Sequence, residues 1–521
     1  MTASARAPRG RSRLDGARVA ALIAVAAVLA PALAVVARAA VAGEAWSRLD
    51  PGRVGRLLTN TLLLAGMAGV IALAVGLAGA WATSRHRFRG RRLAIALLLS
   101  PLGVPPYLVA QYWIEISGPT GPLQSVLGGV FFGKLWAAAA VIGLCTSPLC
   151  FGVLRAALGR LDRRYEEAAA TLGAGPGTRL VQVVLPLLRP ALAAGFALVA
   201  LYACSDFGAV SALGVQTFTR EIFFELELNF DRGAARSATA VLSLVLLGVA
   251  APFFALDRWG RGAARFGGGR PVDAKALSIG GQVAVWAGVA VVVVPTSGLV
   301  VVRTLSLMEP GRGRLWGKAF EALGTTLLWA TTAATIAVVV ALLIAWVARR
   351  RQMGALVPLG SVGFVLPGPV VALGALLLVT ASAWSRAHLY GTAAVLIAAW
   401  VVRALPEALQ ALDAGLEQVP ESFEEAARTL GRTPVRAVGA VTLPLLSRSL
   451  AAGWVFVFAA AMRELPAAML LKPLGSRTLS HELWAYAQDS MYADMAPAAL
   501  LLLLATAPAT TLILLRAGRD S

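Results

Sequence analysis

Residues 166–173 read EEAAATLG and residues 424–431 read EEAARTLG, so one acidic, alanine-rich octet occurs twice at an offset of 258 positions. The match continues at the same offset, because LPLL at 185–188 falls on LPLL at 443–446, and AAG at 193–195 falls on AAG at 451–453. Self-similarity at a fixed offset indicates an internal duplication. The chain is therefore predicted to contain two related halves.

The composition assigns the chain to a lipid bilayer. Of its 521 residues 58% are hydrophobic and 14% are charged, and the mean hydropathy is +0.74, which is too apolar for a soluble chain of this size. The net charge of +20 comes from basic residues that punctuate apolar runs. This pattern favours a role in membrane topology, and we expect no nucleic-acid partner.

Apolar runs long enough to cross about 30 Å of hydrocarbon as a helix predict an all-α polytopic protein with about twelve spans. The basic N-terminus precedes a long apolar run, which we interpret as an uncleaved first span. The spans are predicted in two groups of six, at 18–40, 57–83, 93–115, 135–157, 191–205 and 237–256, and at 279–302, 321–348, 356–381, 389–411, 448–463 and 495–515.

The arginine-rich segments predict the orientation of these spans. With the N-terminus in the cytoplasm, the segments RHRFRGRR (85–92) and RRR (349–351), both octets and the C-terminal tail all fall on the cytoplasmic side. The predicted domains are a basic tail (1–18), a first six-span unit (19–256), a Gly- and Arg-rich cytoplasmic linker (257–278) and a second six-span unit (279–521).

Each octet has the features of a short surface helix. Paired glutamates in the first turn complement the helix dipole, and alanines favour the helix. Gly173 and Gly431 follow, where a left-handed residue can end the helix. A second amphipathic stretch, 179–188, is expected next, with Pro186 near the start of the following span.

These motifs resemble the signature loop of the permease subunits of bacterial binding-protein-dependent ABC importers: Glu-Ala-Ala, three residues, Gly, nine residues, an aliphatic residue, one residue, Leu-Pro. Both copies fit, with Val183 and Val441 where the family often has isoleucine. In that family the loop is the coupling helix that docks on the ATPase. The resemblance therefore assigns ATPase coupling to Glu166, Glu167, Ala168, Ala169, Gly173, Pro186, Glu424, Glu425, Ala426, Ala427, Gly431 and Pro444.

The resemblance also implies the type I importer permease fold and its partners. We expect two copies of an ABC ATPase, a periplasmic binding protein, and a multi-pass location in the bacterial inner membrane with both termini cytoplasmic. The chain itself is expected to hold no cofactor and no metal, and to be a transport subunit rather than an enzyme. An ordinary interfacial helix is the alternative for each octet, but it needs no fixed Glu, Gly and Pro spacing.

Two further stretches narrow the substrate. SDFGAVSALGVQTFTREIF (205–223) and RELPAAMLLKPLGSRTLSHELW (463–484) resemble the corresponding parts of fused ferric-iron permeases, which carry both units in one chain. Thiamine, phosphonate and polyamine permeases remain alternatives. A secondary transporter of the major facilitator type is a more remote one, because it leaves the duplicated Glu-Ala-Ala loops unexplained.

Motifs that would indicate an enzyme are incomplete. GGVFFGKL (128–135) begins like a phosphate-binding loop, but Leu135 stands where Ser or Thr is needed, so we interpret it as a turn at the membrane edge. The histidines form no HExxH pair, and no Gly-x-Ser-x-Gly elbow is present. The three cysteines suggest neither a disulfide framework nor a zinc site.

Asp206 and Glu464 superimpose at the offset of 258, at the periplasmic ends of the fifth and eleventh predicted spans. Ionisable groups at such depth usually face a partner or a water-filled path. We therefore predict that they flank a translocation pathway and suit a hard cation. The alternative is that Glu464 pairs with Arg463 or another basic residue while Asp206 caps the following turn.

Overall fold

The computed structural model describes residues 16–119, 121–128, 130–228, 232–263, 275–308 and 313–519. These residues form helices and turns, apart from two strands of two residues each, β1 (His86–Arg87) and β2 (Lys275–Ala276), which pair in parallel. The prediction of an all-α protein is confirmed.

The helices follow the same order in both halves, and several begin at the offset of 258. The first half contains α1 (Gly16–Ala40), α2 (Gly43–Ser47), α3 (Pro51–Arg85), α4 (Arg91–Leu99), α5 (Pro106–Ser117), α6 (Gln124–Leu127), α7 (Leu135–Arg160), α8 (Arg163–Thr171), α9 (Pro176–Arg179), α10 (Leu185–Ser205), α11 (Gly208–Ala212), α12 (Phe218–Leu228) and α13 (Arg232–Ala263). The second half contains α14 (Ile279–Val293), α15 (Leu299–Ser306), α16 (Gly313–Arg350), α17 (Leu356–Gly360), α18 (Gly368–Thr380), α19 (Ala383–His388), α20 (Ala393–Glu417), α21 (Glu421–Thr429), α22 (Pro434–Ala437), α23 (Leu443–Arg463), α24 (Pro466–Leu471), α25 (Leu479–Gln488) and α26 (Tyr492–Arg519).

Nine helices of the described chain are long and apolar enough to cross a membrane, and two bent pairs raise the number to eleven. The twelfth predicted span lies in α26, whose apolar part within the described residues, Tyr492–Ala507, is shorter than a span. The observed elements thus match the predicted order of spans.

The third and ninth spans, predicted as single runs at 93–115 and 356–381, are broken. The chain turns by 89° between Arg91–Gly103 and Pro106–Ser117, and by 108° between Leu356–Phe364 and Gly368–Thr380. A 3₁₀ turn precedes each break, at Ser100–Gly103 and Ser361–Phe364. Prolines cause both breaks, since a proline inside a helix removes one backbone hydrogen bond and clashes with the preceding turn.

The fifth and eleventh spans begin earlier than predicted. Gly177–Ser205 and Val435–Arg463 are each one continuous helix of 29 residues, so no separate amphipathic helix covers 179–188. A π-helical turn ends two residues before the proline in both, at Leu180–Val184 and Val438–Thr442. Pro186 and Pro444 have no backbone N–H, so neither can donate the usual helical hydrogen bond to the preceding turn. The wider π turn lies where this hydrogen bond is missing.

Glycine brings the long helices of one half into close contact. A Cβ atom on Gly76 of α3 would lie 2.6 Å from Cβ of Cys150 in α7, and one on Gly143 of α7 would lie 2.9 Å from the carbonyl oxygen of Ala68. Small residues allow this approach, and close packing rather than a hydrophobic drive holds helices together within a bilayer.

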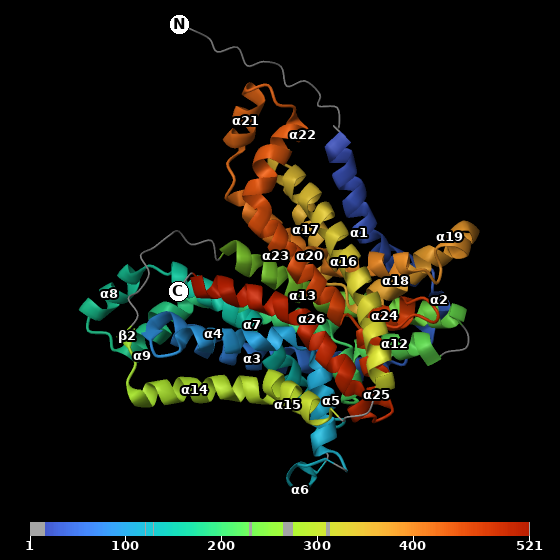
Figure 1. Ribbon diagram of the computed structural model, residues 1–521, viewed down its shortest axis with the longest axis horizontal. Helices are drawn as coiled ribbons and strands as arrows, with labels where there is room; N and C mark the ends of the chain where they lie inside the picture. Colours follow the sequence, from blue (N-terminus) through green and yellow to red (C-terminus); the bar gives the residue numbers. More distant parts are fainter. Residues whose placement is uncertain are drawn as a thin grey trace.

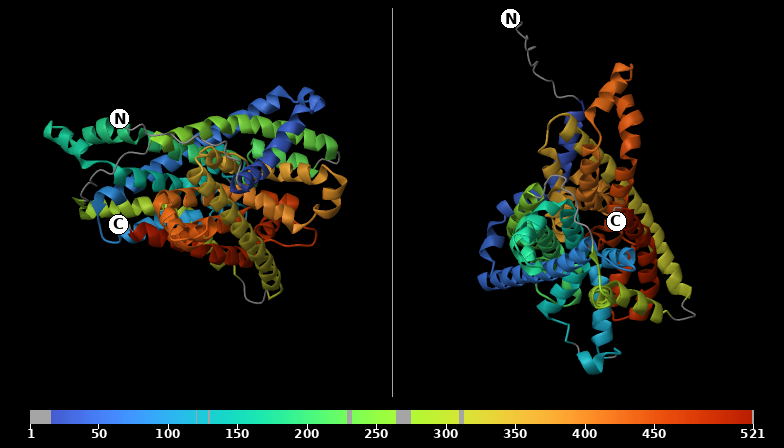
Figure 2. Two further views of the ribbon diagram at one scale, coloured as in Figure 1. Left: turned by 90° about the horizontal axis from the view of Figure 1, so that it is seen from above. Right: turned by 90° about the vertical axis from the view of Figure 1, so that its left-hand side faces the viewer.

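The two halves interlock by exchanging their first helices. Helix α1 packs against α16 and α18 of the second half, and α14 and α15 pack against α3, α4 and α5 of the first half. Figures 1 and 2 show the long helices of the two halves running in different directions around a shared centre. The chain is therefore one interlocked body rather than two separate units.

The short helices that contain the octets lie at the ends of long helices. Helix α8 follows α7 at the left of Figure 1, and α21 follows α20 at its top. The linker predicted at 257–278 starts later than expected, because α13 continues to Ala263; residues 264–274 lie outside the described residues. Strand β2 then joins the start of the second half to β1 of the first.

Candidate functional site

Helices α8 and α21 end as their glycines predict. Gly173 has φ of +81° and Gly431 has φ of +83°. After α8, the amide of Gly173 donates to the carbonyl of Ala170 at 3.0 Å, and the amide of Ala174 donates to that of Ala169 at 3.0 Å. This is the Schellman pattern, in which a left-handed residue satisfies the last carbonyls of the helix, and α21 repeats it.

The first glutamate of each octet points toward the membrane spans. Glu166 pairs with Arg85, the last residue of α3, at 2.5 Å. Glu424 pairs with Arg350, the last residue of α16, at 3.1 Å and accepts a hydrogen bond from the Thr442 hydroxyl at 2.7 Å. The exposed fractions are 16% for the Glu166 side chain and 10% for that of Glu424. Both glutamates therefore hold the short helix to a span and are not on its outer surface.

The rest of each octet forms that outer surface. Glu167, Ala168, Glu425 and Ala426 are exposed, Ala169 is partly buried and Ala427 is buried. An apolar pair accompanies them at the constant offset: Leu172 is 88% exposed and Leu430 is 84% exposed, while Tyr165 and Phe423 are 56% and 49% exposed. We call these four residues the outer apolar pairs of α8 and α21.

The sequence interpretation missed these pairs and the buried arginines. The pairs were part of the repeated octet and its flanks, but only the glutamate, alanine, glycine and proline positions of the motif were assigned a role. Arg85 and Arg350 were assigned to topology alone, although each ends a span at the position where a glutamate of the next surface helix can reach it. A signal was present in both cases.

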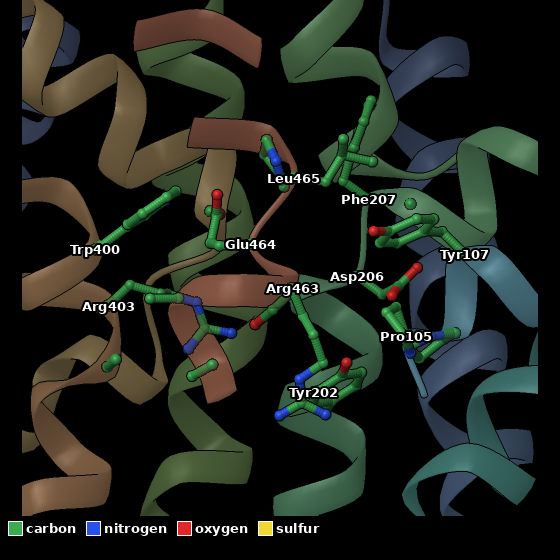
Figure 3. A pocket seen from close by; sticks show the side chains of 18 of the residues that line it. Pro105, Tyr107, Tyr202, Asp206, Phe207, Trp400, Arg403, Arg463, Glu464 and Leu465 are labelled. Carbon is green, nitrogen blue, oxygen red and sulfur yellow. The ribbon is translucent and has the colours of Figure 1, made fainter. Parts of the chain in front are cut away.

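Asp206 and Glu464 come together at the centre of the molecule. They directly follow α10 and α23, and both line one cavity of about 150 Å³ together with Tyr107, Tyr202 and Trp400. Figure 3 shows them on opposite walls of this space, which we call the central cavity. The two carboxylates, one from each half, thus line the same cavity, and their role in a translocation pathway stays a prediction.

Each carboxylate also caps a short helix. Oδ1 of Asp206 accepts from the amide of Ala209 at 2.9 Å, and Oε2 of Glu464 accepts from the amide of Ala467 at 2.9 Å. The expected alternative for Asp206 is therefore observed, whereas Glu464 caps a helix instead of pairing with Arg463. One oxygen of each carboxylate is engaged in this way.

Hydroxyl groups fix the backbone at both carboxylates in the same manner. The Thr219 hydroxyl donates to the carbonyl of Asp206 at 2.7 Å, and the Ser480 hydroxyl donates to that of Glu464 at 3.0 Å. Gly368 allows Glu464 its position, since a Cβ atom there would lie 2.6 Å from Oε1 of Glu464. The backbone at the two carboxylates of the central cavity is therefore held by the same kind of hydrogen bond in both halves.

Three further charged residues line the central cavity: Arg403, Glu407 and Arg463. Arg463 was expected only as a partner of Glu464, and Arg403 and Glu407 were missed because only the ends of the spans were searched for ionisable groups. Arg403 and Glu407 lie four residues apart inside a predicted apolar span, and charged residues at this depth face the protein interior or a polar cavity. That criterion identifies them without a structure.

The remaining predicted features lie away from this centre. Within GGVFFGKL, residues 130–133 form turns before α7, with Gly133 at φ of +71°. The described element directly before this stretch is the short helix α6, whereas a phosphate-binding loop follows a strand. The three cysteines are buried and unpaired. Among the described residues no group of three His, Cys, Asp or Glu side chains is placed to hold a metal ion.

A helical membrane protein with two interlocked halves, one anchored surface helix on each half and a charged cavity between them belongs to the class of transport permeases. Residues 72–259 and 333–517 both match the family described as binding-protein-dependent transport system inner membrane component. The chain belongs to this family, and it carries the domain twice. It is thus a multi-pass inner membrane transport component, not an enzyme, and such systems include a binding protein and an ATPase.

Curated relatives agree with this assignment. The chain is 30% identical over 432 residues to the Fe(3+)-transport system permease protein FbpB 2 of Haemophilus influenzae, covering 80% of this chain and 81% of the relative. It is 25% identical over 438 residues to the ferric transport system permease protein FbpB of Actinobacillus pleuropneumoniae, covering 76% and 61%. The sulfate transport system permease protein CysT of Escherichia coli is 34% identical over 184 residues, covering 31% of this chain and 62% of the relative.

Proposed function

We propose that this chain is the permease of an ATP-driven importer of ferric iron, which a periplasmic binding protein delivers. The observation that carries the proposal is the pair of carboxylates, Asp206 and Glu464, one from each half, in a single central cavity. Carboxylate oxygens suit a hard cation. The names of the two ferric relatives support the same substrate.

The ATPase is proposed to bind as two copies, one on α8 and one on α21, through the exposed octet residues and the outer apolar pairs. Both termini are then cytoplasmic, and the chain holds no cofactor of its own. Closure of the ATPases pushes the surface helices, and the ion pairs Glu166–Arg85 and Glu424–Arg350 transmit this movement to α3 and α16. The permease needs only different contacts with the open and closed ATPase states to change its own conformation.

The test is uptake into proteoliposomes that contain the permease and its ATPase, with purified binding proteins loaded with ferric iron, thiamine, a polyamine or a phosphonate. Ferric iron is expected to accumulate in the proteoliposomes as ATP is hydrolysed, whereas the other solutes are expected not to accumulate. Accumulation of a different solute without iron would replace the substrate, while the absence of any ATP-dependent uptake would refute the importer.

Substitution of the two carboxylates tests their role in the pathway. Asp206→Asn and Glu464→Gln each retain an oxygen that can cap the following helix but remove the charge. Iron uptake is expected to fall in the double variant while the amount in the membrane and the bound ATPase stay at wild-type levels. Unchanged uptake would remove both carboxylates from the pathway.

A further inference from the structure

The charges of the central cavity are distributed unequally between the halves. Arg403, Glu407 and Arg463 all come from the second half. At the offset of 258 the first half has Cys145, Leu149 and Ser205 in their places, so only the acidic pair is duplicated. The second half therefore adds two positive charges and one negative charge that the duplication alone does not explain.

The two guanidinium groups are not neutralised by ion pairs within the described part of the chain. Arg463 donates from Nε to the carbonyl of Ala459 at 2.8 Å and from Nη1 to the carbonyl of Leu102, while Arg403 donates to the carbonyl of Gly363 at 3.5 Å. Two of these acceptor carbonyls, those of Leu102 and Gly363, lie in the 3₁₀ turns of the broken spans. A guanidinium has five N–H donors, so both side chains keep donors for the cavity.

The guanidinium groups line two neighbouring cavities. Tyr202, Arg403, Glu407 and Arg463 line both the central cavity and a larger one of about 460 Å³. The larger cavity lies farther along α20 and α23 toward the ends that carry α21, since Gln410 and Phe456 line it. In Figure 3 Arg403 and Arg463 extend into this shared region beside Tyr202, and cargo that leaves the central cavity in this direction passes both.

A bare trivalent cation is a poor cargo for this arrangement. Three carboxylates and two guanidinium groups give the lining a net charge of about −1 when all are ionised, which leaves most of a charge of +3 uncompensated. Like charges repel strongly where water is scarce, since the interaction grows as the dielectric constant falls. The guanidinium fork instead matches oxyanions, whose oxygens it can bind in pairs.

We propose that iron crosses this permease as a complex with an oxyanionic ligand, of the phosphate, carbonate or polycarboxylate class. Arg403 and Arg463 bind the anion, and the carboxylates of Asp206 and Glu464 face the metal. The volumes suit such cargo, because the two cavities hold several times the roughly 30 Å³ that one water molecule occupies in the liquid. The inference rests on the proposed function and names the chemical form of its substrate.

The test follows two labels at once. Proteoliposomes with permease and ATPase receive binding protein loaded with ⁵⁵Fe and, in separate arms, ³³P-phosphate, ¹⁴C-bicarbonate or ¹⁴C-citrate. Anion is expected to enter with iron at about one to one in at least one arm, and only with ATP. Iron uptake without any of the three anions would overturn the inference and leave the proposed function intact. No iron uptake in any arm would instead refute the proposed function.

Variants test the role of the arginines separately. Arg403→Gln and Arg463→Gln are expected to lower coupled uptake at least tenfold, and Arg403→Lys, which keeps the charge, is expected to lower it less. Arg89→Gln is the matched control, because it removes an exposed arginine outside the cavities. A variant that does not fold is identified by its failure to co-purify with the ATPase. In that case the ratio of anion label to iron label taken up by the wild type still decides whether the anion enters with iron. Equal uptake by all four variants would refute a role of the arginines.

Discussion

The outer apolar pairs allow a sharp test of ATPase docking. Leu172 and Leu430 are 88% and 84% exposed and directly precede the left-handed glycines. Replacing either leucine with alanine removes three carbon atoms that make few contacts with the rest of the chain. Exposed substitutions of this kind change folding stability by about 0.5 kcal/mol or less, so the variants separate ATPase binding from folding.

The expected effect on binding is large. If docking buries each leucine, loss of three carbons at about 0.8 kcal/mol per buried carbon gives about 2 kcal/mol. Since about 1.4 kcal/mol is tenfold in an equilibrium constant, each site should bind the ATPase roughly 30-fold more weakly. Interferometry with the permease in nanodiscs and nucleotide-free ATPase measures this directly.

A matched control separates docking from a general loss of surface apolar area. Leu474 is 100% exposed and lies between α24 and α25, away from α8 and α21. Leu474→Ala should leave the ATPase affinity unchanged. A change below threefold in both Leu172→Ala and Leu430→Ala, or an equal effect of Leu474→Ala, would show that α8 and α21 are ordinary interfacial helices.

Three further outcomes are expected. Glu424→Gln should lower the melting temperature in detergent, because removing one partner of a buried ion pair costs roughly 3–5 kcal/mol before glutamine recovers part of it; the exposed neighbour Glu425→Gln should not. Burial and two nearby cations lower the pKa of His481 in the folded protein to about 4. As the pH falls below about 6.5, the unfolded chain therefore takes up a proton that the folded protein does not, and the folded state loses stability. Between pH 7.5 and 5.5 the free energy of unfolding should fall by roughly 1 kcal/mol more in the wild type than in His481→Gln, after allowance for solvent screening. Reporter fusions after Arg92 should be cytoplasmic and fusions after Gly475 periplasmic, and the reverse result would invert the topology.

Local features of the fold could be predicted from the sequence, and long-range ones could not. The surface helices and their glycine ends depend on a few adjacent residues, so the octets sufficed. The direction of Glu166 depends on Arg85, which is 81 residues away, and no local pattern contains that contact. The same limit applies to the exchange of α1 and α14 between the halves.

Two errors had local causes. The broken spans were predicted as single helices although Pro105, Pro106 and Pro367 lie inside them, because apolar composition was weighed above the effect of proline. The fifth span was started too late because Arg179 and Gln182 are polar. A helix of 29 residues is about 44 Å long, so it extends beyond a bilayer core of about 30 Å and carries polar residues outside it.

The comparison of the halves separates two tasks of the molecule. The features proposed to serve movement occur in both: the surface helix with its left-handed glycine, the glutamate–arginine ion pair, the broken span and the carboxylate cap. The features proposed to select the cargo come from the second half alone: Arg403, Glu407 and Arg463. Under the proposal that two copies of the ATPase bind, a duplicated frame lets both act with equal effect, whereas a cargo without twofold symmetry gains nothing from a symmetric lining. Changes of selectivity are therefore expected from substitutions in α20 and at the end of α23, and changes of coupling from paired substitutions at the offset of 258.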